Sequence, residues 1–224
     1  MNPNQLNQAV ARPQVAGIEV NKVLRNTYML LSLTLLFCAA TAAMSMAYHW
    51  PYPGLILTLV GFYGLSFLTT KFRNSALGLV FVFALTGFMG LTLGPIISAY
   101  IKFLPNGTQL VMTAMGATGI IFLGLSGYVL VTRKDFSFMA GLLFSGILIA
   151  MLAGIGAAIF HMPALSLAVS AMFVLLMSGL ILFETSQIIH GGETNYIMAT
   201  ITLFVAIYNL FLALLQLMAG FGRD

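Results

Sequence analysis

The sequence contains very little charge. Of its 224 residues, 6% are Asp, Glu, Lys or Arg and 60% are hydrophobic. Soluble domains carry about 25% charged residues, which form the surface that water contacts. Acids are the scarcest charged group, with five against nine Lys and Arg. This composition excludes an ordinary soluble domain and predicts a protein whose outer surface faces lipid.

Residues for covalent and metal chemistry are also scarce. Cys38 is the single cysteine, which excludes an intrachain disulfide and a thiolate metal site. The histidines His49, His161 and His190 share neither a loop nor a helical spacing, so we expect no metal site. No nucleophile–base set and no phosphate-binding loop stands out, so we expect no enzyme and no cofactor. The basic residues lie scattered in short loops, which argues against nucleic acid as a partner.

Apolar runs fill most of the chain, separated by short segments with Pro, Gly and charged residues. A helix needs about 20 apolar residues to cross the hydrocarbon core of a bilayer. The predicted fold is an all-α integral membrane protein, a seven-transmembrane-helix bundle in residues 27–220. Residues 1–26 form a polar tail, either disordered or an amphipathic lead-in, and residues 221–224 a short second tail. The predicted spans are 28–48, 54–70, 76–100, 108–132, 137–160, 163–189 and 195–220.

Lys and Arg in the short loops predict the orientation, because cytoplasmic loops are enriched in them. If the spans alternate in direction, seven of the nine basic residues fall on one side and two on the other. We therefore expect a cytoplasmic amino terminus and, after seven spans, a periplasmic carboxy terminus. The first group is Arg12, Lys22, Arg25, Lys71, Arg73, Arg133 and Lys134, and the second is Lys102 and Arg223.

The last apolar run carries a stripe of small and polar residues at alternating spacings of three and four, which places them on one face of a helix. In lipid, helices associate through close backbone approach and interhelical hydrogen bonds. We therefore expect this helix near the middle of the bundle, with the stripe facing other helices. The stripe consists of Ala199, Thr202, Ala206, Asn209, Ala213 and Gln216.

Glu184 is the one acid predicted inside a span, near the cytoplasmic edge of the core. A charged group there is costly unless it faces the bundle or pairs with a base. Two interpretations remain open: Glu184 reaches the interface and binds a loop cation, or it is a proton- or cation-sensitive latch between the last two spans. The candidate partners on the same side are Lys71, Arg73, Arg133 and Lys134.

Four segments together resemble the Bax inhibitor-1 family, also called the transmembrane Bax inhibitor motif family, and most closely its YccA-like bacterial branch. The first is the run 87–98, with Gly90, Gly94 and Pro95, which looks like the family signature. The others are Lys-Asp-Phe-Ser at 134–137, Phe-Glu-Thr-Ser-Gln-Ile at 183–188 and Tyr-Asn-Leu-Phe-Leu at 208–212. The resemblance covers nearly all of residues 20–220.

The resemblance implies a seven-helix fold whose last helix is surrounded by the others. In calcium-leak members of the family, two acids on the last two helices share a proton and gate a pore. Glu184 matches the first of these acids, and Ala206 stands at the second, so the carboxylate pair cannot form here. A pH-sensitive Ca²⁺ or cation leak is therefore the alternative function rather than the leading one.

The YccA-like branch implies a different role in the bacterial inner membrane. Its members are linked to FtsH, the membrane-anchored AAA protease, as substrate and modulator. An ATP-driven protease needs an unstructured handle of about 20 residues, and the polar tail 1–26 could supply one. The leading hypothesis is therefore a modulator, and also a substrate, of that protease. A solubilising leader is the plainer interpretation of the tail.

Overall fold

The computed structural model describes residues 3–221, and the side chains from Val20 onward. Within that range the chain is helical and contains no strand, which confirms the predicted all-α membrane fold. The predicted tail after Phe221, with Arg223, lies outside the described residues, as does the side chain of Arg12. The elements are α1 (Pro3–Ala47), α2 (Leu55–Lys71), α3 (Ala76–Phe103), α4 (Gly107–Thr132), the 3-10 turn η1 (Ser137–Met139), α5 (Ala140–Ile159), α6 (Pro163–His190) and α7 (Tyr196–Phe221).

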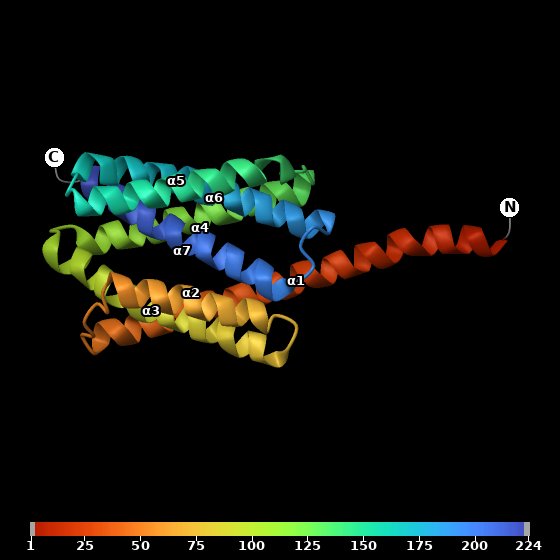
Figure 1. The fold of residues 1–224 in the computed structure, drawn as a ribbon, viewed down its shortest axis with the longest axis horizontal. Helices are drawn as coiled ribbons and strands as arrows, with labels where there is room; N and C mark the ends of the chain where they lie inside the picture. Colours follow the sequence, from red (N-terminus) through yellow and green to blue (C-terminus); the bar gives the residue numbers. More distant parts are fainter. Residues whose placement is uncertain (1–2, 222–224) are drawn as a thin grey trace.

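Helix α1 continues through the boundary that the sequence suggested at residue 26. It is one helix of 45 residues, of which Val20–Ala47 is apolar enough to span a membrane. Extending a formed helix costs little per residue, so the first span supports the segment before it. Figure 1 shows the beginning of α1 extending away from the other helices. The tail was expected to be either disordered or an amphipathic lead-in, and its described part, from Pro3 on, is helical.

Six of the helices are long and apolar enough to cross a bilayer, whereas α2 has only 17 residues. The predicted boundaries differ from the observed ones by a few residues, because the helices continue through Lys71, Phe103 and His190 at their ends. Successive helices are antiparallel, so two ends of the bundle can be named. The basic end holds Lys71 and Arg133, and the C-terminal end is where α7 stops.

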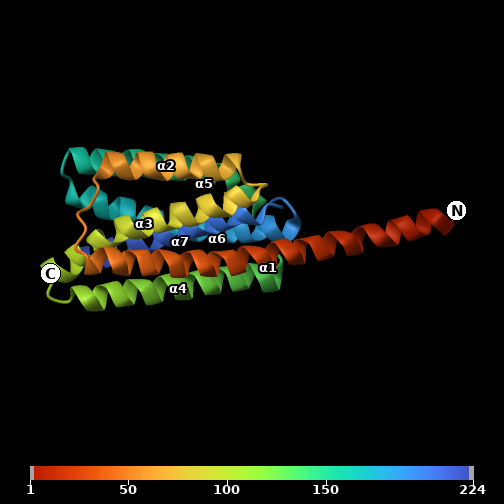
Figure 2. The same cartoon turned by 90° about the horizontal axis from the view of Figure 1, so that it is seen from below.

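Helix α7 crosses the middle of the bundle, between α1 to α3 on one side and α4 to α6 on the other (Figures 1 and 2). It packs against α1, α3, α4 and α6. In its most apolar stretch 61% of residues are buried, against 44% at most in the other candidate spans. Its Leu, Ile and Phe side chains are enclosed as well, because Leu203, Phe204 and Leu210 are at most 1% exposed. The predicted central position of the last helix is confirmed.

Helices α1 and α3 approach closely along the segment that holds Gly90, Gly94 and Pro95. A methyl group added at Gly90 would overlap the carbonyl oxygen of Cys38, and one added at Gly94 would lie 2.7 Å from the carbonyl oxygen of Ala42. Helix α3 also continues through Pro95. The absence of bulk at the two glycines is therefore what lets the backbones meet.

Pro95 has no N–H group and so leaves the carbonyl of Leu91, one turn earlier, without its helical partner. The hydroxyl of Ser45 on α1 donates to that carbonyl oxygen at 3.0 Å. Ser45 is 1% exposed, so this bond is made away from solvent. The Gly-Pro segment thus joins α3 to α1 twice, by close contact and by a hydrogen bond.

Candidate functional site

Glu184 lies on α6, six residues before the helix ends at His190, and is 6% exposed. Its Oε1 atom is buried and has no hydrogen-bond partner within the described residues. Burying a carboxylate without a hydrogen-bond partner is costly. The helix that carries Glu184 packs against α7, α5, α4 and α1.

A cluster of hydroxyl groups joins three helices at the neighbouring position. Tyr28 of α1 and Ser126 of α4 are hydrogen-bonded to each other, and both lie near Thr185 of α6. The Oγ1 atom of Thr185 is 3.4 Å from Ser126 Oγ and 3.5 Å from Tyr28 Oη. Thr27, the residue before Tyr28, has a buried hydroxyl with no partner among residues 20–221. These uncharged hydroxyl groups meet at Thr185, the residue that follows Glu184 on α6.

The four predicted cationic partners occupy other places. Lys71 lies over the ring of Phe72, 5.8 Å from its centroid, and Lys134 lies over Tyr128 at 5.6 Å. None of Lys71, Arg73, Arg133 and Lys134 forms an ion pair with Glu184 in the described part of the chain. The backbone of Arg73 accepts a hydrogen bond from the Asn195 side chain, and Arg133 ends α4 in the left-handed conformation with φ 52°. The charged latch stays a prediction.

Two of the segments that carry the family resemblance, residues 134–137 and residues 183–188, are hydrogen-bonded to each other. The backbone N–H of Phe136 donates to Ser186 Oγ at 3.0 Å, and Ser186 Oγ donates to the carbonyl of Lys134 at 3.3 Å. Asp135 and Gln187 complete the contact through Ser137. The Oδ1 atom of Asp135 accepts from the Ser137 backbone N–H and from its hydroxyl, at 2.8 and 2.5 Å. Gln187 Nε2 donates to Ser137 Oγ at 2.9 Å. We call residues 134–137 with Ser186 and Gln187 the clasp.

The clasp fixes the α4–α5 connection onto the last turns of α6, directly beyond Glu184. Two hydrogen bonds from Ser137 hold the pKa of Asp135 below its usual value, with a smaller contribution from the nearby His190. In contrast, the pKa of Lys134 is raised, because its ammonium group is hydrogen-bonded to the phenol of Tyr128. Both side chains are exposed, so these groups shape a solvated loop at the basic end.

The stripe on α7 divides into two kinds of position. Ala199, Ala206 and Ala213 are buried, whereas Thr202, Asn209 and Gln216 are partly exposed. Ala206 is fully buried in an apolar cluster with Ile181 and Leu210 among others, and its own side chain supplies no carboxylate at the second acid position. Thr202 and Asn209 donate hydrogen bonds to carbonyls of their own helix.

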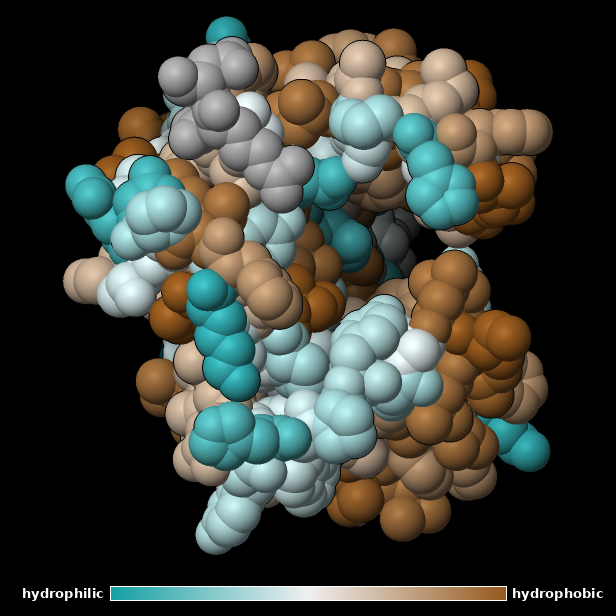
Figure 3. All heavy atoms as spheres, turned by 90° about the vertical axis from the view of Figure 1, so that its left-hand side faces the viewer, coloured by the Kyte–Doolittle hydropathy of each residue, from teal (hydrophilic) through white to brown (hydrophobic). Residues whose placement is uncertain are grey.

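Gln216 makes the one interhelical hydrogen bond of the stripe within the described residues, because its Nε2 atom donates to Ser166 Oγ on α6 at 2.5 Å. Two cavities lie at this point, of about 440 and 250 Å³, and Gln216 and Ser166 line both. Figure 3 looks onto the C-terminal end and shows a hollow between two groups of atoms, with hydrophobic atoms at its outer rim. Sequence analysis identified Gln216 but missed Ser166, because one serine in an apolar run gives no signal of its own.

The chain matches the family described as inhibitor of apoptosis-promoting Bax1 over residues 20–223. It is 53% identical over 220 residues to an uncharacterised protein of Pseudomonas aeruginosa, covering 98% of this chain and 97% of that one. It is 50% identical over 207 residues to an Escherichia coli protein named modulator of FtsH protease YccA, covering 92% and 94%. Protein lifeguard 4 of Mus musculus is 31% identical over 209 residues, covering 89% and 85%.

Proposed function

Because the chain belongs to the Bax inhibitor-1 family, we propose that it is a multi-pass inner-membrane protein that binds and modulates a membrane-anchored AAA protease of the FtsH type. The observation that carries the proposal is the 50% identity, over 92% of this chain, to the protein named modulator of FtsH protease. The matched stretch covers nearly all of the chain. We further propose that the protein is a substrate of the same protease and has no catalytic activity of its own.

The shape of the basic end supports this proposal. Helix α1 extends beyond the bundle there (Figure 1), on the side where Arg133 and Lys134 lie. A protease anchored in the same membrane can reach this segment, because the segment projects from the bundle. A terminal segment with few tertiary contacts opens at low free-energy cost, which suits it to be gripped and pulled.

Deletion of residues 2–19 tests the proposal. The deletion removes the projecting segment and leaves the apolar part of α1, from Val20 on, intact. We expect the shortened protein to persist several-fold longer in cells that contain the protease, as measured by pulse–chase with an antibody against a tag. In cells depleted of the protease the full chain and the shortened chain should have equal lifetimes.

A matched control keeps the length but changes the attachment site: the same 18 residues are moved to the carboxy terminus. We expect this variant to be as long-lived as the deletion, because the segment then leaves the bundle at the other end. Two results would contradict the proposal: a full-length protein whose lifetime does not depend on the protease, or a protein that cannot be co-purified with the protease in mild detergent.

A cation leak is the second candidate function, and the burial of Glu184 with an unpartnered oxygen favours it. The hydroxyl groups of Tyr28 and Ser126 lie near Thr185, the residue that follows Glu184. The test is Ca²⁺ flux into liposomes between pH 6 and 8, comparing the wild type with Glu184→Gln. Flux that falls in the variant supports the leak, and flux no greater than in empty vesicles removes it.

A further inference from the structure

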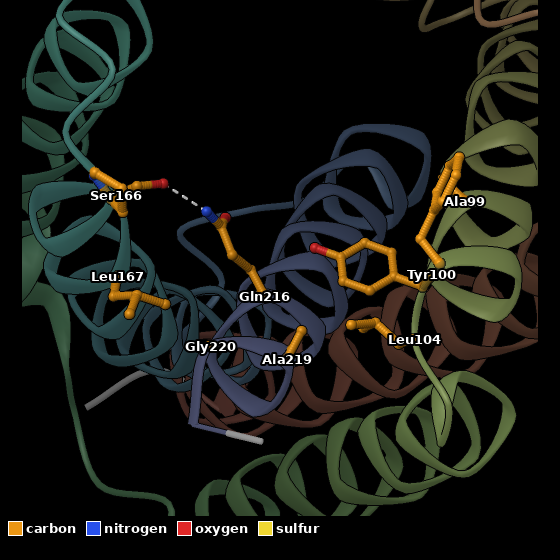
Figure 4. A pocket seen from close by; sticks show the side chains of 10 residues that line it. Ala99, Tyr100, Leu104, Ser166, Leu167, Gln216, Ala219 and Gly220 are labelled. Carbon is orange, nitrogen blue, oxygen red and sulfur yellow. Dashed lines mark hydrogen bonds between the residues drawn. The ribbon is translucent and has the colours of Figure 1, made fainter. Parts of the chain in front are cut away.

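A cleft lies above α7 near the C-terminal end, between α3 and α6. Its two cavities, of about 440 and 250 Å³, share Ser166 and Gln216 and together extend from Leu104, just after α3, to Gly154 of α5. Figure 4 shows Ser166 and Gln216 on one side and Tyr100 extending toward them from α3. Leu104 and Leu167 line the outer part and Phe173 lines the inner part.

The cleft opens toward the surface that lipid covers. Helix α2 packs on α3 and α5 packs on α6, but neither pair packs extensively against the other in the described residues. A single hydrogen bond, from Tyr63 Oη to Met151 Sδ at 3.7 Å, joins α2 to α5. Figure 3 shows the opening between the two groups, lined by hydrophobic atoms at its edge. The molecules next to this opening in a membrane are phospholipids.

The polar groups of the cleft are suited to an uncharged hydrogen-bond acceptor. Ser166 Oγ accepts the hydrogen bond from Gln216, so its own O–H must donate elsewhere. The backbone carbonyl of Ser166 already accepts from Ser170. Among residues 20–221, no Lys, Arg, His, Asp or Glu lines either cavity, so no charged side chain described there would neutralise a phosphate or a metal ion. An uncharged carbonyl oxygen is a suitable acceptor for the O–H of Ser166.

Depth narrows the occupant further. Gln216 is five residues from the end of α7 at Phe221, about 8 Å inside the helix end. That depth is close to the boundary between hydrocarbon and head groups, where lipid ester groups lie. We propose that the cleft binds one glycerolipid, with an ester carbonyl on Ser166 and an acyl chain lying along α7 toward Phe173.

The test uses the purified full-length protein in nanodiscs with phosphatidylethanolamine that carries a diazirine near the end of one acyl chain. After illumination, we expect crosslinks on the α6 and α7 peptides that contain Phe173 and Leu212. Gly154→Leu should reduce them about fivefold, because the new side chain fills the inner cavity. A Cβ atom at Gly154 makes only an ordinary contact with Val169, at 3.5 Å, so the backbone tolerates the change.

The matched control is Gly156→Leu on the same helix, where an added Cβ meets nothing within 4 Å. It should retain the wild-type crosslinks. A second variant, Gln216→Leu, should lower the amount of phospholipid retained in native mass spectrometry about fivefold, since it frees Ser166 from its fixed orientation. This measurement decides the question if Gly154→Leu does not fold.

Three outcomes would overturn the proposal. Crosslinks confined to the outer surface, such as exposed α4, would show that no lipid enters the cleft. Equal crosslinking of the Gly154 and Gly156 variants would show the same. Rapid reaction of Ser170→Cys with a charged thiol reagent that cannot cross membranes would show a water-filled cleft instead. The native Cys38 is buried, so it adds little background to this measurement.

Discussion

At the scale of single residues, Ser45 completes the hydrogen bonding of a helix other than its own. The carbonyl that Pro95 leaves open on α3 is one that a bilayer cannot satisfy, because no water reaches it. Ser45 on α1 supplies the missing donor at 3.0 Å. Ser45 is a weak signal in the sequence, since a serine among apolar residues has many explanations. Its role can be inferred only when Pro95 is known to lie inside a continuous helix.

Replacing Ser45 by alanine should therefore lower the unfolding free energy by about 1 kcal/mol, the usual value of a hydrogen bond between membrane helices. The measurement is denaturant unfolding in detergent micelles, followed by circular dichroism. Ser32→Ala is the control, because the Ser32 hydroxyl is exposed and bonds only to the Tyr28 carbonyl of its own helix. Equal effects from the two variants would show that the interhelical bond adds nothing to stability.

Glu184 shows what sequence can and cannot predict about a site. Its place on α6, near the basic end, was predictable because acids are rare in this chain and this one falls inside an apolar run. The absence of a cationic partner was not predictable from sequence. Lys71 and Lys134 lie at the same end of the bundle as Glu184, but their side chains contact aromatic rings instead. The hydroxyl groups of Tyr28, Ser126 and Thr185 come from three helices that no spacing rule relates.

At the scale of helices, periodicity predicted well what close packing requires. On α3, Gly90 and Gly94 are four residues apart, which places both on one face of the helix, and both lie against α1. The polar stripe on α7 indicated a central helix, and α7 is the most enclosed one. Composition could not reveal that the apolar face of α7 is buried too, because lipid and protein interiors select the same side chains.

Gly90→Ala should weaken the α1–α3 contact by about 1–3 kcal/mol, because the added methyl group collides with the Cys38 backbone and cannot be relieved by a rotamer change. Gly116→Ala on α4 is the matched control. Nothing lies within 4 Å of an added Cβ there, so the higher helix propensity of alanine should leave stability unchanged or raised by up to about 1 kcal/mol. Thermal unfolding of both variants in the same detergent distinguishes them, and a Gly90 variant as stable as the control would refute the contact.

The clasp predicts a pH dependence of stability. The pKa of Asp135 is lower in the folded chain than in the unfolded one, because Ser137 donates to the ionised carboxylate. Its contribution is therefore fully present above the unfolded pKa of about 4 and is lost as the pH falls through the lower, folded value. Wild type should exceed Asp135→Asn in Tm at pH 7, and the difference should shrink below pH 4.

Ser137→Ala provides the check on this cause. It removes one of the two donors to Asp135 and should make the pH-dependent difference smaller. Melting curves from pH 7 to pH 3 measure the effect, with Gly116→Ala as a variant that should follow the wild type throughout. A difference between wild type and Asp135→Asn that stays constant over this range would mean that folding does not lower the pKa of the clasp carboxylate.

At the scale of the whole molecule, the orientation depends on whether α2 crosses the membrane. Six helices are long enough by themselves, and α2, with 17 residues, is about 26 Å long against a core of about 30 Å. Helix α2 nevertheless lies along α3 (Figures 1 and 2). Lys71 is its last residue, and Tyr52 comes just before its first turn. Such residues anchor a short helix by reaching the two interfaces.

If α2 spans, seven crossings place the two termini on opposite sides, and the excess of Lys and Arg at the basic end puts that end in the cytoplasm. Alkaline phosphatase fused after residue 224 should then be active, and the same enzyme inserted after Lys134 should be inactive. Green fluorescent protein at the same two points should give the opposite pattern, because it folds only in the cytoplasm. An inactive phosphatase after residue 224, together with fluorescence there, would mean that the number of crossings is even and that α2 lies in the bundle without crossing the bilayer.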